Sequence, residues 1–153
     1  MEILQIPAKM KFEYDIEGGN FSRAGFASSE VKKKLRQLNV DIQIVRRIVV
    51  ALYEAEVNVV AHAWYGKMTV DIDEEKILLI LDDEGPGIED IDLAMKEGFS
   101  TASPEVREMG FGAGMGLPNI KKNVDTLKIT SEPGKGTRVE MITYMKGGKN
   151  EKS

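Results

Sequence analysis

Residues 41–64 read DIQIVRRIVVALYEAEVNVVAHAW, and their apolar spacing is that of one long amphipathic helix. Asp41 is a suitable N-cap, because its side chain can accept hydrogen bonds from the first unpaired backbone N–H groups. Glu54, Asn58 and His62 recur every four residues and therefore share one face. Gly66 is expected to end the helix near Trp64. The apolar side chains on another face are Val45, Ile48, Val49, Leu52, Val59 and Val60.

Shorter elements are predicted on both sides of this helix, from alternating apolar residues, helical spacing and turn-forming residues. The expected strands are residues 10–16, 68–72, 76–82, 127–131 and 137–145, and the expected helices are residues 21–38, 91–96 and 117–127. Several strands follow one another with only a turn between them, which favours antiparallel pairing. We therefore expect an α+β fold, a two-layer sandwich whose mixed, mostly antiparallel sheet carries the helices on one face.

Length and composition set the broad class. A chain of 153 residues is long enough for one domain with its own core, expected over residues 1–145, with a polar tail at 146–153. An apolar fraction of 42% and a charged fraction of 30% are typical of a soluble protein. No apolar stretch approaches the roughly 20 residues of a membrane span. We expect a cytoplasmic protein that does not bind membranes.

Charge and cysteine content exclude further classes. Residues 71–110 carry three basic and thirteen acidic side chains, which argues against nucleic acid lying across that surface. The chain has no cysteine, so disulfide bonds and thiolate metal sites are excluded.

Three blocks carry the candidate chemistry, and the first is the pair Glu54 and Asn58. Side chains four residues apart on a helix point the same way. An amide oxygen suits magnesium, which binds few protein groups together with phosphates and water. A carboxylate one turn away can orient or deprotonate an attacking hydroxyl or water. Taken alone, the pair is more simply explained as a polar helix surface.

The second block is Asp83-Glu84-Gly85-Pro86-Gly87-Ile88, directly after a predicted strand. A carboxylate at the end of a buried strand can accept a hydrogen bond from an exocyclic amine such as that of adenine. Glycines after it allow the backbone to approach a flat ring. An ordinary acidic turn explains this block about equally well.

The third block is Gly110-Phe111-Gly112-Ala113-Gly114-Met115-Gly116-Leu117-Pro118. It closes a glycine-rich segment, 98–116, that we expect to be a long mobile loop. The start of the following helix offers unpaired N–H groups that suit phosphate. The spacings of a P-loop and of a Rossmann G-x-G-x-x-G motif are both absent.

Together, the order and spacing of the three blocks resemble the GHKL, or Bergerat-fold, ATPases, which include gyrase, the Hsp90 chaperone, histidine kinases and MutL. Glu54 and Asn58 resemble the N box of that family. Asp83-x-Gly85-x-Gly87 resembles its first glycine box, and the run from Gly110 to Gly116 resembles the second, which ends the ATP lid. Gly136-Thr137 resembles a late Gly-Thr pair whose threonine helps hold the adenine-binding aspartate. The resemblance covers roughly residues 41–144.

The resemblance implies a role for each matching residue. Asn58 would hold magnesium, Glu54 would be the general base, and Asp83 would bind adenine with help from Thr137. ATP, ADP and magnesium are the implied ligands. The further implied nucleotide contacts are Gly85, Gly87, Ile88, Gly110, Gly112, Gly114, Gly116 and Leu117, and candidates for contact with phosphate or a partner are Arg107 and Lys121.

Within this superfamily, Phe99-Ser100-Thr101 and Gly116-Leu117-Pro118-Asn119-Ile120 look most like the bacterial anti-sigma-factor serine kinases. Members of that branch phosphorylate a serine or threonine of an antagonist protein, often a small STAS domain. The implied function is an ATP-dependent protein serine/threonine kinase, and the implied partner is such an antagonist or a sigma factor. Whether the chain forms a homodimer is left open.

Two other functions remain open: a non-catalytic module that binds a partner according to nucleotide, and the stand-alone catalytic domain of a split histidine kinase. We favour a structural role for His62. Glu56 falls within the apolar stripe of the long helix. Because burying an unpaired carboxylate is costly, we expect it to meet a basic partner such as an arginine.

Overall fold

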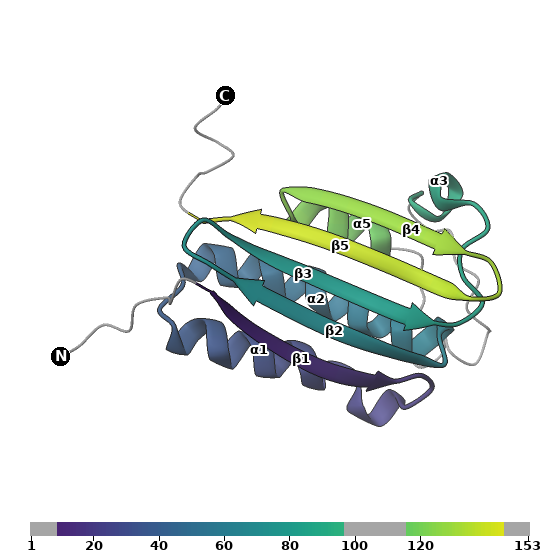
Figure 1. Cartoon of the computed structure of the whole chain (residues 1–153), viewed down its shortest axis with the longest axis horizontal. Helices are drawn as coiled ribbons and strands as arrows, with labels where there is room; N and C mark the ends of the chain where they lie inside the picture. Colours follow the sequence, from purple (N-terminus) through teal and green to yellow (C-terminus); the bar gives the residue numbers. More distant parts are fainter. Residues whose placement is uncertain (1–8, 97–115, 146–153) are drawn as a thin grey trace.

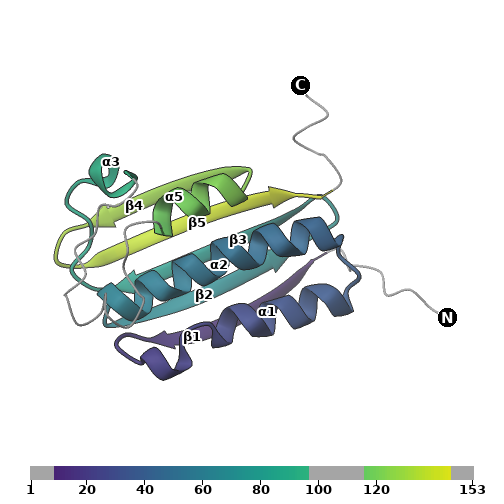
Figure 2. The same ribbon diagram turned by 180° about the vertical axis from the view of Figure 1, so that it is seen from behind.

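The computed structural model describes residues 9–96 and 116–145, in which one sheet is covered on one face by helices (Figures 1 and 2). The strands are β1 (Met10–Glu17), β2 (Tyr65–Ile72), β3 (Lys76–Glu84), β4 (Thr126–Glu132) and β5 (Gly136–Tyr144). Their order across the sheet is β1-β2-β3-β5-β4. Every pairing is antiparallel, so the α+β, two-layer prediction is confirmed while its expectation of a mixed sheet is wrong for the described strands.

The helices are η1 (Phe21–Arg23), α1 (Phe26–Gln37), α2 (Ile42–His62), α3 (Ile91–Ala94) and α5 (Gly116–Asn123). None of the helices in the described parts of the chain is long and apolar enough to cross a membrane. The hairpin of β2 and β3, with its turn at residues 73–75, and the hairpin of β4 and β5 both form as predicted.

Helix α2 begins where the sequence predicts. The Asp41 side chain accepts hydrogen bonds from the backbone N–H groups of Gln43 and Ile44, at 3.2 and 3.4 Å. The helix ends at His62, however, and Gly66 lies inside β2. A Cβ atom on Gly66 would lie 2.7 Å from Cγ1 of Val59, so this glycine allows the strand to approach the helix and does not end it.

The sequence predicted one helix over residues 21–38, but the structure has two separate helices there, η1 and α1. Gly25, with φ of +91°, separates η1 from α1. This backbone conformation is accessible to glycine and strained for other residues. The helical periodicity on both sides of Gly25 concealed the break.

The other predicted boundaries differ by a few residues. The helix expected over 117–127 ends at Asn123, because Thr126 and Leu127 already pair with Ile142 and Met141 in the sheet. Strand β3 continues past Asp82 to Glu84, so Asp83 belongs to the strand and not to the turn.

The core lies between the sheet and its helices. The predicted apolar face of α2 packs there, with Val49 only partly buried. Sheet residues such as Val70, Leu79 and Met141 meet this face from the other layer. The large apolar face of α2 therefore fixes the position of the helix across the sheet. This position in turn fixes the direction in which the polar face of α2 points.

Glu56 is buried, with 2% of its surface exposed, but its partners are not basic. Its carboxylate accepts hydrogen bonds from the backbone N–H groups of Gly25, Ala27 and Ser28 and from the Ser28 hydroxyl, at 2.6–3.2 Å. The expectation of an arginine is therefore wrong. Unpaired N–H groups and the positive end of the dipole at the start of α1 take the place of a cation.

Candidate functional site

The polar face of α2 meets the first turn of α5. Glu54 and Asn58 are both half-buried. Asn119 donates a hydrogen bond from Nδ2 to Oε2 of Glu54 at 3.0 Å. Gly116 lies against the amide of Asn58, since a Cβ atom there would be 3.0 Å from Oδ1. The sequence predicted the Glu54–Asn58 pair, but it gave no sign that α5 contacts both residues.

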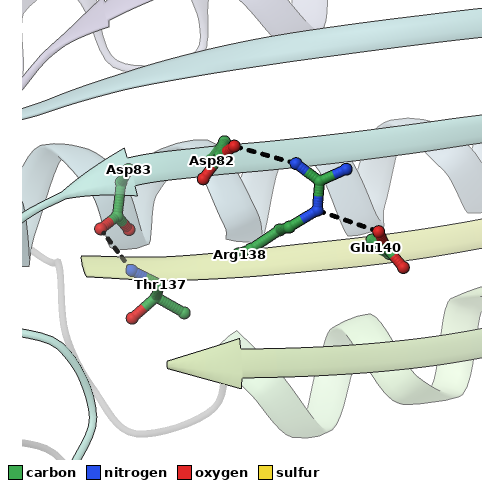
Figure 3. A network of polar contacts seen from close by, with 5 residues as sticks. All are labelled: Asp82, Asp83, Thr137, Arg138 and Glu140. Carbon is green, nitrogen blue, oxygen red and sulfur yellow. Dashed lines mark hydrogen bonds and ion pairs between the residues drawn. The ribbon is translucent and has the colours of Figure 1, made fainter. Parts of the chain in front are cut away.

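Asp83 is the second candidate group, and strand alternation decides which way it faces. Leu79, Leu81 and Asp83 lie on the helix-covered side of β3, whereas Asp82 lies on the other side. There Arg138 pairs with Asp82 and with Glu140, each at 2.9 Å (Figure 3). Of the two adjacent aspartates, only Asp83 is therefore directed towards the layer that contains α2.

The environment of Asp83 combines burial with one fixed hydrogen bond. The backbone N–H of Thr137 donates to Oδ1 of Asp83 at 3.0 Å (Figure 3). Burial raises the pKa of Asp83 above its ordinary value, the Thr137 N–H opposes this, and the charge of Asp82 adds to the increase. Only one carboxylate oxygen is used by this bond, so the other oxygen has lone pairs to offer a ligand.

Asp83 and the α2 pair belong to one region of the molecule. Gly66 pairs with Asp83 across β2 and β3. A Cβ atom on this glycine would lie 2.7 Å from Val59 and 3.5 Å from Cβ of Asp83. Because Val59 follows Asn58 in α2, the strand end and the polar helix face are close neighbours.

Ser131 is a site residue that sequence reasoning missed. Its hydroxyl accepts the Ile88 N–H at 2.7 Å and lies 3.0 Å from the Gly136 carbonyl and 2.9 Å from the Thr137 hydroxyl. A hydroxyl has one proton, which here goes to the carbonyl, so the Thr137 hydroxyl donates to Ser131. The available signal was register, since Ser131 pairs with Thr137 across the predicted hairpin.

The two glycines after Asp83 have packing reasons of their own. Gly85 donates its N–H to the Lys135 carbonyl at 3.0 Å, and a Cβ atom on it would lie 2.9 Å from Cα of Ala63. Gly87 has a φ of +77°, and a Cβ atom there would lie 2.6 Å from the Glu132 carbonyl oxygen. Both glycines hold the segment after β3 against the turn between β4 and β5.

The remaining candidates are placed unevenly. Leu117 is buried in the core, Ile88 is half-buried and packs against the core, and Lys121 is exposed on α5. His62 is half-buried near the end of α2, and burial lowers its pKa below the ordinary 6.5. The candidates that lie outside the described residues are Arg107, Gly110, Gly112 and Gly114.

Metal binding by side chains alone finds no support in residues 9–96 and 116–145, where no group of three or more His, Asp or Glu residues could hold an ion. A divalent cation beside Asn58 would need most of its ligands from a bound molecule. Magnesium binds in this way when phosphates and water complete its shell. The Asn58 amide offers one oxygen, a type of ligand that fits such an ion.

Comparison with known proteins gives independent results. Residues 42–146 match the family model of the histidine kinase-, DNA gyrase B-, and HSP90-like ATPases. The chain is 36% identical to the anti-sigma F factor of Caldanaerobacter subterraneus subsp. tengcongensis over 125 residues, which cover 78% of this chain and 84% of the relative. It is 32% identical to the serine/threonine-protein kinase RsbT of Bacillus subtilis over 104 residues, covering 65% and 72% of the two chains. It is 30% identical to the anti-sigma F factor of Clostridium acetobutylicum over 146 residues, covering 91% and 94%.

Proposed function

Since the chain belongs to the histidine kinase-, DNA gyrase B-, and HSP90-like ATPase family and, within it, to the anti-sigma-factor kinases, we propose that it is an ATP-dependent serine/threonine protein kinase. The observation that carries the proposal is that Glu54 and Asn58 share the half-buried polar face of α2, close to Asp83 at the end of β3. The groups that would accept adenine, bind magnesium and act as the base would thereby lie in one region.

Asp83 would recognise the base. Its free carboxylate oxygen can accept a hydrogen bond from the 6-amino group of adenine, while Thr137 holds the other oxygen. ATP and ADP share this amino group, so both are expected to bind. Guanine and hypoxanthine present a carbonyl oxygen at the same position, which would face the carboxylate without a proton between them.

Asn58 would hold magnesium through Oδ1, against which Gly116 packs without a side chain. Magnesium held there with the nucleotide would neutralise part of the charge that develops during phosphoryl transfer. The hydroxyl oxygen of a serine or threonine then forms a bond to the γ-phosphorus. The bond between that phosphorus and the β,γ-bridging oxygen breaks, the hydroxyl proton passes to Glu54, and ADP leaves.

The acceptor would be a protein, since the relatives are named as anti-sigma factors and as a protein kinase. We propose a small STAS-like antagonist as the phosphorylated partner, and a sigma factor as the protein whose availability the reaction controls. Transfer to a serine or threonine would use Glu54 as the base together with the bound nucleotide and its magnesium.

Calorimetry and phosphoryl transfer test the proposal in two steps. Titration with ATP and ADP, with and without magnesium, should show binding to the wild type and weak binding to Asp83→Asn. Incubation with γ-labelled ATP and STAS-domain proteins of the same organism should give acid-stable phosphoserine or phosphothreonine, which Glu54→Ala should abolish. An absence of nucleotide binding would overturn the whole proposal.

The same assay distinguishes the two alternatives. Binding of a partner that depends on nucleotide, with no phosphate transfer, would identify a non-catalytic module. Acid-labile phosphohistidine on a partner would instead identify the catalytic domain of a split histidine kinase.

A further inference from the structure

The geometry points to Asn119 as the positioning residue of the base: its side-chain amide holds one oxygen of Glu54 and leaves the other oxygen to take the proton. This inference rests on the proposed function, in which Glu54 is the base. It adds a residue whose part in the reaction neither the motif spacing nor the comparisons indicate.

In the hydrogen bond between Asn119 and Glu54, the donor and the acceptor are both defined. Nδ2 of Asn119 lies 3.0 Å from Oε2 of Glu54, and both side chains are half-buried. An ionised carboxylate only accepts hydrogen bonds, so the amide must present its NH₂ group and not its oxygen. A hydrogen bond to a charged acceptor is stronger than one between neutral groups. The amide therefore restricts the rotation of the carboxylate.

Two contacts one helical turn apart fix how α5 lies on α2. Gly116 meets Asn58, and Asn119 meets Glu54, so the first turn of α5 runs antiparallel to the turn of α2 that carries both residues. The missing side chain at position 116 permits the close approach that brings the amide of Asn119 within reach. Asn123 donates from Nδ2 to the Asn119 carbonyl at 2.8 Å and braces the short helix.

The consequence for the reaction concerns the two oxygens of the base. Oε2 is occupied by the Asn119 amide, so Oε1 is the oxygen that accepts the proton of the attacking hydroxyl or water. A base acts only from hydrogen-bonding distance of the proton that it removes. Without Asn119 the carboxylate would rotate freely, and the rate of transfer would fall while nucleotide binding stayed the same.

Four variants of the full chain test this, with MgATP as substrate and water as acceptor under single-turnover conditions. Asn119→Ala should slow phosphate release about tenfold, because a displacement of catalytic groups by about 1 Å can cost up to about 100-fold. Asn119→Asp, the variant closest in shape, should be slower still, since it sets a second carboxylate against Glu54. Asn119→Gln keeps the amide and should recover most of the rate. ATP affinity by calorimetry should change less than twofold in all three.

Asn123→Ala is the matched control, because it removes an amide from the same helix without touching Glu54. Its rate should stay within twofold of wild type. Equal losses in Asn123→Ala and Asn119→Ala would assign the effect to the stability of α5 and overturn the inference. If Asn119→Asp lost less of the rate than the other Asn119 variants, the inference would also be overturned, since the shape of the side chain alone would then matter.

A second readout needs no nucleotide. The side-chain NH₂ protons of Asn119, identified by their loss in Asn119→Asp, should move upfield in the NMR spectrum of Glu54→Ala, and unchanged shifts would contradict the contact. The two proposals fail in different ways. If the wild type releases phosphate no faster than Glu54→Ala, Glu54 is not the base, and this inference fails as well. If Glu54→Ala is slow but Asn119→Ala has the wild-type rate, this inference alone fails.

Discussion

At the scale of single residues, the proposed recognition of adenine depends on one oxygen of Asp83. Thr137 holds the other oxygen through its backbone N–H, and Ser131 fixes the hydroxyl of Thr137. Sequence reasoning found Asp83 because a carboxylate at the end of a predicted strand can accept a hydrogen bond from adenine, and the glycines after it resemble the first glycine box of the family. It did not find Ser131, whose importance arises from hydrogen bonds to Ile88 and Gly136 that only the folded hairpin brings together.

Asp83→Asn should weaken ATP binding about 10- to 100-fold, because a hydrogen bond to a charged group contributes about 1.5–3 kcal/mol. The variant retains Oδ1 for the Thr137 N–H but directs an NH₂ group at the amino group of adenine. Calorimetry measures the loss, and thermal unfolding shows whether the fold is intact. Unchanged affinity in a folded variant would remove Asp83 from the site.

His62 gives a prediction about pH. Burial lowers the pKa of His62 below 6.5, so the unfolded chain takes up the proton first as the pH falls. The stability that the neutral imidazole contributes is complete above the unfolded pKa and is lost as the pH falls through 6.5 towards the folded value. Urea unfolding at pH 7.5 and 5.5 should therefore show a larger loss for wild type than for His62→Gln. Equal losses of stability in the two proteins would contradict the lowered pKa of His62.

At the scale of elements, the sequence predicts best what depends on local pattern. Helix α2 with its Asp41 cap and the β2–β3 hairpin follow from periodicity and turn residues close in the chain. The break at Gly25 and the place of Gly66 depend instead on Tyr53 and Val59, whose side chains approach from α2. Such contacts between distant residues leave no periodic signal in one sequence.

Glu56 joins two helices by acting as the N-terminal cap of α1 from outside that helix. Glu56→Gln should lower the free energy of unfolding by about 1–3 kcal/mol, since the new NH₂ group would face backbone donors and leave one unsatisfied. Urea denaturation measures the change. Glu74→Gln, in an exposed turn, is the matched control and should have little effect. Equal stability of both variants would show that the cap is dispensable.

Gly116→Ala separates binding from stability at the start of α5. Alanine favours a helix by up to about 1 kcal/mol over glycine, so the fold should not be weakened by the helix itself. Its Cβ atom would, however, lie 3.0 Å from Oδ1 of Asn58. We expect the magnesium-dependent part of ATP affinity to fall about tenfold, which corresponds to about 1.4 kcal/mol. An equal loss with and without magnesium would argue against Asn58 as the ligand.

At the scale of the whole molecule, the site draws on α2, β3, the β4–β5 hairpin and α5, which are far apart in sequence. The α+β architecture could be predicted, and so could the places of Glu54 and Asn58 on one helix and of Asp83 near a strand end, because each lies in a local motif. The way α5 lies on α2 could not be predicted, because it depends on packing between helices. The predicted roles of Arg107, Gly110, Gly112 and Gly114 lie outside the described residues.

A ligand whose site is formed by so many helices and strands should stabilise the whole fold. At a free ATP concentration of 100 times Kd, the free energy of unfolding should rise by about 2.7 kcal/mol, provided that the unfolded chain does not bind. Urea unfolding with and without MgATP measures the increase, and Asp83→Asn at the same ATP concentration should show much less. An equal increase in both proteins would show that binding does not use Asp83.

The place of β5 between β3 and β4 has a consequence for how the protein is made. β5 comes last of the five strands along the chain, yet it supplies the backbone N–H that holds Asp83. A nascent chain emerging from the ribosome would have β1, β2 and β3 available long before residue 137 leaves the exit tunnel. Until then β4 has no neighbour in the sheet, and the Asp83 carboxylate lacks the Thr137 N–H that orients it. Competence to bind nucleotide would thus be acquired late, once β5 has been inserted between two strands that were synthesised before it.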